Sequence, residues 1–297
     1  MQDERYAFRG KRHLILPVLF LLPQLVITVV FFFYPAGEAL LGSVYMEDSF
    51  GLSREFVGLD NFAVLFSDPG YLETLYLTFI FSIATITLTM TVSLLMAVVA
   101  DQVHVGGTLY KSMLIIPYAV APPLAGVLWL FLFNPSVGVL STFLDGLGYT
   151  WNHKLNGNQA LLLLIISASW KQISYNFLFF LAGLQAIPRS LIEAAAIDGA
   201  SPWQRFRNII FPLLSPTTFF LLVVNTIYTL FETFGIVHAV TQGGPSRATE
   251  TLIYKVFNDG FIGLDFGGSS AQSVVLMFIV MILTFLQFRY VERKVNY

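Results

Sequence analysis

The sequence contains no cysteine, little charge and none of the common catalytic signatures. The lack of cysteine excludes disulfide bonds, thiolate nucleophiles and cysteine-ligated metal sites. Charged residues make up 11% of the chain, against about 25% in soluble domains, and the net charge of −2 does not favour a nucleic-acid partner. No Gly-x-x-x-x-Gly-Lys-Ser/Thr, His-Glu-x-x-His or Gly-x-Ser-x-Gly sequence occurs, so we predict neither an ATP site nor catalysis by this polypeptide.

The histidines do not indicate a metal site either. The four of them stand far apart along the chain, at positions 13, 104, 153 and 238. A metal ion needs several ligands close together. We therefore interpret these histidines as side chains at the membrane edges, and we predict no metal site.

Long apolar runs dominate what the sequence does contain. Hydrophobic residues are 56% of the chain, and the mean hydropathy is +0.72. A helix needs ~20 apolar residues to cross a hydrocarbon core of ~30 Å. Six segments reach this length, at about 14–34, 75–100, 109–133, 159–185, 213–231 and 271–289. We predict an all-α, polytopic membrane bundle of six transmembrane helices, with 14–34 retained because it is too long for a signal-peptide core.

The basic residues predict how the bundle is oriented. With the N-terminus in the cytoplasm, eleven of the sixteen lysines and arginines lie at cytoplasmic segments or the adjoining ends of spans. The positive-inside rule thus favours both termini inside, with 1–13 and 186–212 cytoplasmic. The outer segment 35–74 is acidic, and the outer segment 232–270 contains turn signals and short apolar patches, so we expect it to be partly folded.

The cytoplasmic segment 190–212 has the pattern of two short helices joined at a glycine. Ser190 with Glu193 three residues later predicts a capping box, and Gly199 predicts a left-handed stop. Ser201, Pro202 and Gln204 then predict a second helix start. Such a hairpin at a membrane face is typical of a docking element.

The same hairpin resembles the EAA loop of type I ABC importer permeases. The matching residues are Glu193, Ala194, Ala195, Asp198, Gly199, Ala200, Ile209, Pro212 and Pro216, while Phe211 stands where leucine is usual. The resemblance implies the type I permease fold, with an ABC transmembrane domain at about 72–284, in the bacterial inner membrane. It also implies that this loop seats in a cleft of a cytoplasmic ATPase and transmits its closure to the spans.

The resemblance further implies a set of partners. These are a homologous second permease, two cytoplasmic ATPase subunits, a periplasmic substrate-binding protein and a small-molecule solute. ATP and Mg²⁺ would bind to the ATPase subunits, and no cofactor is expected in this chain.

Lys171 lies near the middle of the span 159–185, where a charge costs at least ~2.5–3.5 kcal/mol. Its ammonium therefore faces a solute path and attracts an anion, or pairs with a buried carboxylate such as Glu232, or snorkels to the interface. Residues 117–123 hold three prolines, which predict a kink or break in the third span. Our candidate pathway residues are Lys171, Tyr175, Asn176 and Tyr118; Asn176 and Asn225 are also candidates for hydrogen bonds between spans.

Several further stretches resemble one subfamily, the first permease subunits of bacterial sn-glycerol-3-phosphate importers. They are 31–41, 56–62, 117–122, 170–180, 252–255, 271–278 and 288–292. The acidic outer surface would repel a free phosphate ester, so a binding protein would have to deliver it. The alternatives are an importer of a neutral sugar or oligosaccharide, an ion-coupled carrier, which should show inverted repeats and intramembrane acids, and a membrane enzyme, which needs a reactive constellation.

Overall fold

The computed structural model describes residues 12–48, 53–103 and 107–292, and this part of the chain is almost entirely helical. The predicted segment 1–13 therefore lies largely outside the described residues. Two short strands, β1 (Tyr45–Glu47) and β2 (Arg54–Phe56), pair antiparallel in an outer hairpin. The fold class predicted from the apolar runs is confirmed.

Four continuous helical stretches are long and apolar enough to cross a membrane. They are Pro17–Gly42, Pro69–Asp101, Gly157–Ala186 and Phe266–Tyr290. Two further pairs qualify when each bent pair counts as one span, Leu109–Ala119 with Pro122–Leu132 and Pro202–Leu213 with Ser215–Glu232. The described structure thus contains four spans, or six with the bent pairs.

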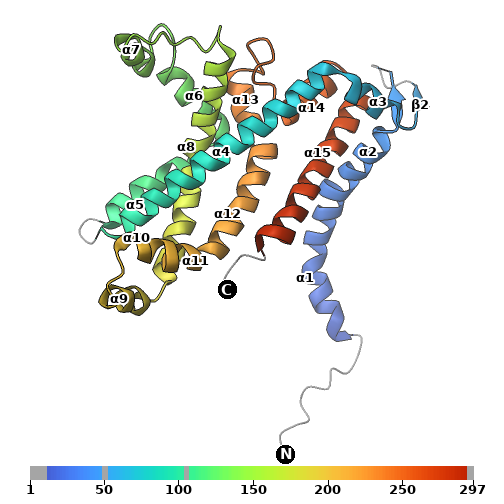
Figure 1. Ribbon diagram of the computed structural model, residues 1–297. Coiled ribbons are helices and arrows are strands. Elements are labelled where there is room, and N and C mark those ends of the chain that lie inside the picture. Colours follow the sequence, from blue (N-terminus) through green and yellow to red (C-terminus); the bar gives the residue numbers. More distant parts are fainter. Residues whose placement is uncertain (1–11, 49–52, 104–106, 293–297) are drawn as a thin grey trace, which may run out of the picture.

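The first stretch combines α1 (Arg12–Thr28), a π-helical turn and α2 (Tyr34–Gly42). In Figure 1 it runs beside α15 (Phe266–Leu286), which continues into the π-helical turn η6 (Gln287–Val291). The contact is made through α2, since a Cβ on Gly42 would lie 2.7 Å from Ser270 Oγ. From residue 18 on, the apolar side chains of α1 are exposed in the described chain and are available to lipid or to another subunit.

The prolines of residues 117–123 break the third span, as predicted. α5 (Gly107–Ile115) passes into the 3₁₀ turn η2 (Ile116–Ala119), and α6 (Pro122–Leu132) leaves it at a bend of 102°. Proline lacks the backbone donor that a continuous helix would use at these positions, so the chain turns there.

The core of the bundle is the packing of α4 (Pro69–Asp101) against α8 (Gly157–Ala186), visible in Figure 1. Apart from Tyr71 and Phe81, the buried side chains of α4 are small: Thr74, Thr78, Ser82, Thr85, Thr89, Ser93, Ala97 and Ala100. Small residues let helix backbones approach closely in a membrane. Their hydroxyls are partly satisfied within the helix, as where Thr78 donates to the Thr74 carbonyl at 2.7 Å.

Short helices occupy the two ends of the bundle. At one end lie α3 (Asp60–Ser67), α7 (Val139–Gly146), α13 (Phe234–Val240) and α14 (Leu252–Phe257). At the other end lie α9 (Arg189–Ile197), α10 (Pro202–Arg205), the turn η3 (Phe206–Ile210) and α11 (Phe211–Leu213), which leads into α12 (Ser215–Ile227). The beginning of α1 and the end of α15 also lie at this second end, on the same side of the bundle as the hairpin 190–212.

Candidate functional site

The hairpin begins differently from its predicted form. α9 starts at Arg189 after Pro188, and no side chain caps it, so the predicted capping box of Ser190 and Glu193 is wrong. Pro188 has a fixed φ of −59°, and its carbonyl accepts the first helical bond from Leu191 N at 3.1 Å. Glu193 therefore lies one turn inside α9, with its side chain exposed to solvent.

The glycine elbow has the predicted geometry. Gly199 has φ +83°, which is a left-handed conformation that a side chain with Cβ rarely adopts. Gly199 N donates to the Ala196 carbonyl at 3.1 Å, and Ala200 N donates to the Ala195 carbonyl at 2.9 Å. These two bonds form a Schellman motif that ends α9.

The second helix start is also confirmed. Ser201 Oγ accepts from Gln204 N at 3.3 Å, while Gln204 Oε1 accepts from Ser201 N at 2.7 Å. Pro202 occupies the first helical position. The reciprocal bonds fix the direction of α10 relative to the elbow.

The hairpin exposes several apolar side chains, which is unfavourable unless a partner covers them. Ile197 is 87% exposed and Trp203 65% exposed, and Leu191 and Phe211 are each nearly half exposed. Ile210, by contrast, packs against the core cluster of α4, α8 and α12. The hairpin is therefore anchored on one side to the spans and open on the other, as a docking element must be.

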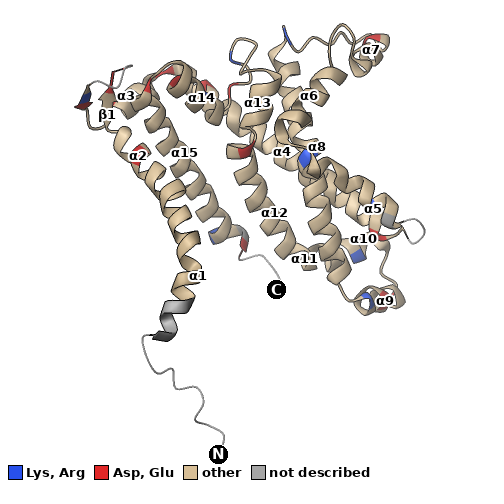
Figure 2. Ribbon diagram, turned by 180° about the vertical axis from the view of Figure 1, so that it is seen from behind, with Lys and Arg blue, Asp and Glu red and all other residues tan. Residues whose placement is uncertain are grey.

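A cavity of about 460 Å³ lies behind the hairpin, between the ends of α4, α5 and α8. Charged side chains of both signs line it: Asp101, Lys111, Arg189 and Glu193. In Figure 2, charge gathers at the ends of the bundle and is sparse along the spans. Glu193 thus lies at an open, charged recess, where it can meet a group from another subunit.

Three of the four predicted pathway residues lie together. Lys171 is 9% exposed, and its Nζ lies 5.4 Å from the centre of the Tyr118 ring. The Tyr118 and Tyr175 rings are 5.5 Å apart. Because Tyr118 comes from the broken turn η2, the break carries an aromatic side chain to the ammonium on α8.

Glu232, one of the alternatives considered for Lys171, does not form a buried ion pair with it in the described structure. Its side chain is exposed at the end of the π-helical turn η4 (Tyr228–Glu232), and no ion pair joins it to Lys171 among the described residues. Lys171 therefore has no carboxylate partner among the described residues.

Asn176 lies apart from this group. It follows Tyr175 on α8 and points into the bundle, where it is fully buried. Neither its side-chain nitrogen nor its oxygen has a hydrogen-bond partner among the described residues. Asn225 is also buried and donates to the Leu221 carbonyl at 2.7 Å on its own helix.

Two aromatic residues extend the group beyond the sequence prediction. Phe179 lies 4.8 Å from Tyr175 and 5.2 Å from Phe220 of α12, between ring centres. Helical spacing places Lys171, Tyr175 and Phe179 on one face of α8, so Phe179 was recognisable from the sequence. Phe220 was not, because its place depends on the packing of α12 against α8.

The histidine interpretation needs one correction. His153 is buried, and Trp151 Nε1 donates to its Nδ1 at 3.3 Å. Burial lowers the pKa of His153, and the charge of Lys154 lowers it further. His238 is exposed and stacks on Phe234, and the side chains of His13 and His104 lie outside the described residues. Within the described chain, no group of three or more His, Asp and Glu is arranged to hold a metal ion.

Solved structures share this fold. The bacterial alginate ABC transporter in complex with alginate pentasaccharide-bound periplasmic protein matches at TM-score 0.79 and 21% identity, covering 95% of this chain and 96% of that chain. A bacterial ABC transporter involved in the import of the acidic polysaccharide alginate matches at TM-score 0.78, also at 21% identity, over 94% and 97% of the two chains.

Curated relatives are far more similar in sequence. The sn-glycerol-3-phosphate transport system permease protein UgpA of Rhizobium meliloti (strain 1021) is 59% identical over 294 residues, which is 99% of each chain. The protein of the same name from Pectobacterium atrosepticum is 56% identical over 297 residues, the whole of both chains. Residues 13–297 match the family described as "Binding-protein-dependent transport system inner membrane component". This chain therefore belongs to that family and is a multi-pass, non-catalytic permease component of the inner membrane.

Proposed function

We propose that this chain is one of two permease subunits of an importer for sn-glycerol 3-phosphate. The support is the identity of 56–59% to relatives of that name over nearly the full length. Lys171 adds a chemical reason, because an ammonium among aromatic rings at mid-span suits an anionic solute. Two cytoplasmic ATPase subunits would bind ATP, and a periplasmic binding protein would deliver the solute.

Lys171, Tyr118 and Tyr175 are the pathway residues of this proposal, and Glu232 joins them. The ammonium would attract the phosphate, and the carboxylate would accept hydrogen bonds from the hydroxyl groups. Asn176, which lies inside the bundle, would instead act in packing between spans.

Uptake by the complete transporter tests the substrate. Proteoliposomes containing both permeases, the ATPases and the binding protein should accumulate labelled glycerol 3-phosphate in an ATP-dependent way. Glycerophosphodiesters serve as competitors, and labelled maltose is assayed in parallel. Accumulation of maltose without accumulation of glycerol 3-phosphate would instead support the neutral-sugar alternative, for which the aromatic residues beside Lys171 provide stacking surfaces.

The coupling residues of the proposal are Glu193, Ala194, Ala195, Asp198, Gly199, Ile209 and Pro212. ATP-driven closure of the ATPases would move the hairpin, and the spans would change from inward- to outward-facing. The exposed Ile197 and Trp203 would supply apolar contact with the ATPase. Differential binding of the solute to the two conformations makes such transport directional.

We expect Glu193 to act through its negative charge in the contact with the ATPase, and not by capping α9. Truncating one member of an interfacial charge pair costs about 2–5 kcal/mol, so Glu193→Gln and Glu193→Ala should both weaken assembly with the ATPase by tenfold or more. Co-purification of the ATPase subunits measures this effect.

Ser201→Ala is the matched control for this prediction. It removes about 1 kcal/mol of helix capping from the same hairpin and leaves the charge of Glu193 in place. Assembly of both Glu193 variants at the level of the unmodified protein would exclude the charge contact.

A further inference from the structure

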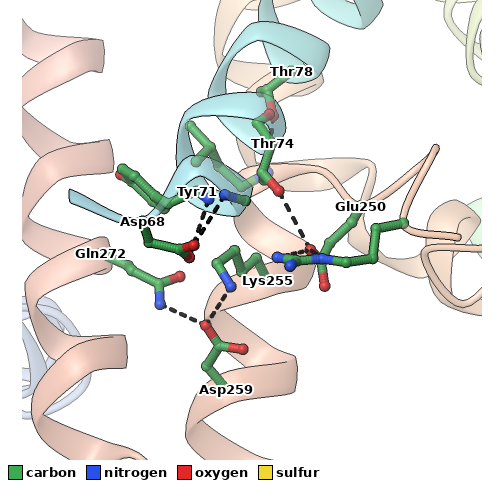
Figure 3. A network of polar contacts seen from close by, with 11 residues as sticks. Asp68, Tyr71, Thr74, Thr78, Glu250, Lys255, Asp259 and Gln272 are labelled. Carbon is green, nitrogen blue, oxygen red and sulfur yellow. Dashed lines mark hydrogen bonds and ion pairs between the residues drawn. The ribbon is translucent and has the colours of Figure 1, made fainter. Parts of the chain in front are cut away.

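The outer segment between α13 and α15, residues 241–265, lies across the outer ends of two spans. It contains α14 and the π-helical turn η5 (Asn258–Ile262). Figure 3 shows its charged side chains between α4 and α15 in two groups of polar contacts. The two groups make separate connections, one to each span.

The first connection joins the outer segment to α4. Arg247 Nε and Nη2 both lie 2.7 Å from Glu250 Oε2, and Thr74 Oγ1 of α4 donates to the same oxygen at 3.3 Å. One turn further along α4, Thr78 Oγ1 accepts from Leu252 N at 2.9 Å. Glu250 is buried, so this carboxylate depends on these partners for the solvation it has lost.

The second connection joins the segment to α15. Lys255 Nζ lies 2.8 Å from Asp259 Oδ2, and Gln272 Nε2 of α15 donates to the same oxygen at 2.7 Å. Lys255 and Gln272 are both buried. The backbones are close here as well, since a Cβ on Gly260 would lie 2.7 Å from Ser269 Oγ.

The segment also packs against α13, which begins two residues after Glu232. Phe257 of α14 lies 5.0 Å from Phe234, and Tyr254 lies 6.1 Å from it, between ring centres. Phe234 follows Glu232 by two residues at the start of α13. Contacts that hold α14 in place therefore also hold the outer end of the helical stretch that begins with α12 and continues through η4 into α13.

We propose that these two clamps, Arg247–Glu250–Thr74 and Lys255–Asp259–Gln272, join α4, the outer segment and α15 into one rigid outer unit that moves as a whole when the permease opens outward. Glu250 and Lys255 are then positioning residues for transport. Apolar side chains could hold these helices together equally well. A hydrogen-bonded charge network, by contrast, holds them in one relative geometry. The inference depends on family membership and not on the identity of the solute.

A distance measurement tests the rigid unit directly. Tyr76 of α4 and Phe261 of η5 are exposed, and this chain has no cysteine, so a pair of cysteines at these positions accepts spin labels specifically. Pulsed electron paramagnetic resonance on the complete transporter in nanodiscs should give one narrow distance, the same without nucleotide and after ATP trapping. A mean distance that differs between the two states would overturn the proposal, and no solute is required for either result.

Substitutions then test the clamps. Lys255→Met and Glu250→Gln should broaden the distance distribution and reduce binding-protein-dependent transport at least tenfold, while basal ATPase activity remains. Arg54→Gln is the matched control, because the Arg54–Glu47 pair at 2.8 Å is on the outer hairpin and accessible to solvent. An unchanged distribution in both clamp variants would overturn the proposal.

A double variant separates positioning from stability. If Lys255→Met assembles poorly, the combination with Asp259→Leu removes the stranded charge and should restore the yield of the complex. We expect transport to stay low in that double variant because the fixed geometry is lost. Transport restored together with yield would show that the pair acts only in stability, against the proposal.

Discussion

Gly199→Val should abolish the response of ATP hydrolysis to the loaded binding protein while the permease still inserts and accumulates. Valine at φ +83° is strained at a cost of about 1–3 kcal/mol, which α9 can avoid only by leaving its Schellman motif. Nothing lies within 4 Å of a Cβ at this position, so the effect is conformational and not a steric clash. The elbow between α9 and α10 would change direction, and the hairpin would no longer fit its partner.

Gly148→Val is the matched control for this prediction. Gly148 has φ +82°, and a Cβ there would also have nothing within 4 Å, but this glycine lies in the outer segment between α7 and α8. The two substitutions impose the same local strain at opposite ends of the bundle. Stimulated ATPase activity, transport and membrane abundance should be measured in both, and normal stimulation in Gly199→Val would contradict a coupling role for the elbow.

The parts of the fold that the sequence predicts well are those governed by local rules. Apolar length predicted the spans, proline chemistry predicted the break near Tyr118, and the pattern from Ser201 to Gln204 predicted a capping box that is present. The prediction of the first helix start was wrong because two helix-start signals, Pro188 and Ser190, lie close together. Pro188 ends the preceding segment and begins α9 through its backbone, so Ser190 is already inside the helix.

The relations that the sequence does not predict depend on packing between distant segments. The approach of Tyr118 to Lys171 needs both the 102° bend and the docking of η2 on α8. The same holds for the outer clamps. By composition the outer segments are acidic, but Glu47, Glu250 and Asp259 each have a basic partner within 2.8 Å. These pairings leave the net negative charge of the outer segments unchanged, but composition alone could not show which carboxylates they involve.

Lys171→Met should reduce uptake of glycerol 3-phosphate at least tenfold while the complex assembles normally. Loss of one favourable contact of ~1.4 kcal/mol with an anionic solute already gives that factor. Assembly should hold because Glu232 is exposed and unpaired with Lys171 in the described structure, so no buried carboxylate is left stranded. Removing the charge also removes a mid-span cost of at least ~2.5–3.5 kcal/mol, so thermal stability of the complex should be equal or higher.

Two further variants decide how Lys171 acts. Lys171→Arg keeps the charge and offers a planar fork that suits a phosphate, so it should retain more uptake than Lys171→Met. Lys154→Met, at an exposed lysine of the outer segment, is the matched control and should transport normally. Yield and uptake are measured in parallel. A scarce Lys171→Met complex that Glu232→Gln rescues would show a structural ion pair in another conformation. Full yield with unimpaired uptake would reject both roles and leave a lysine that reaches the interface. Reduced uptake at full yield, with the arginine variant intermediate, is the result that places the ammonium on the solute path.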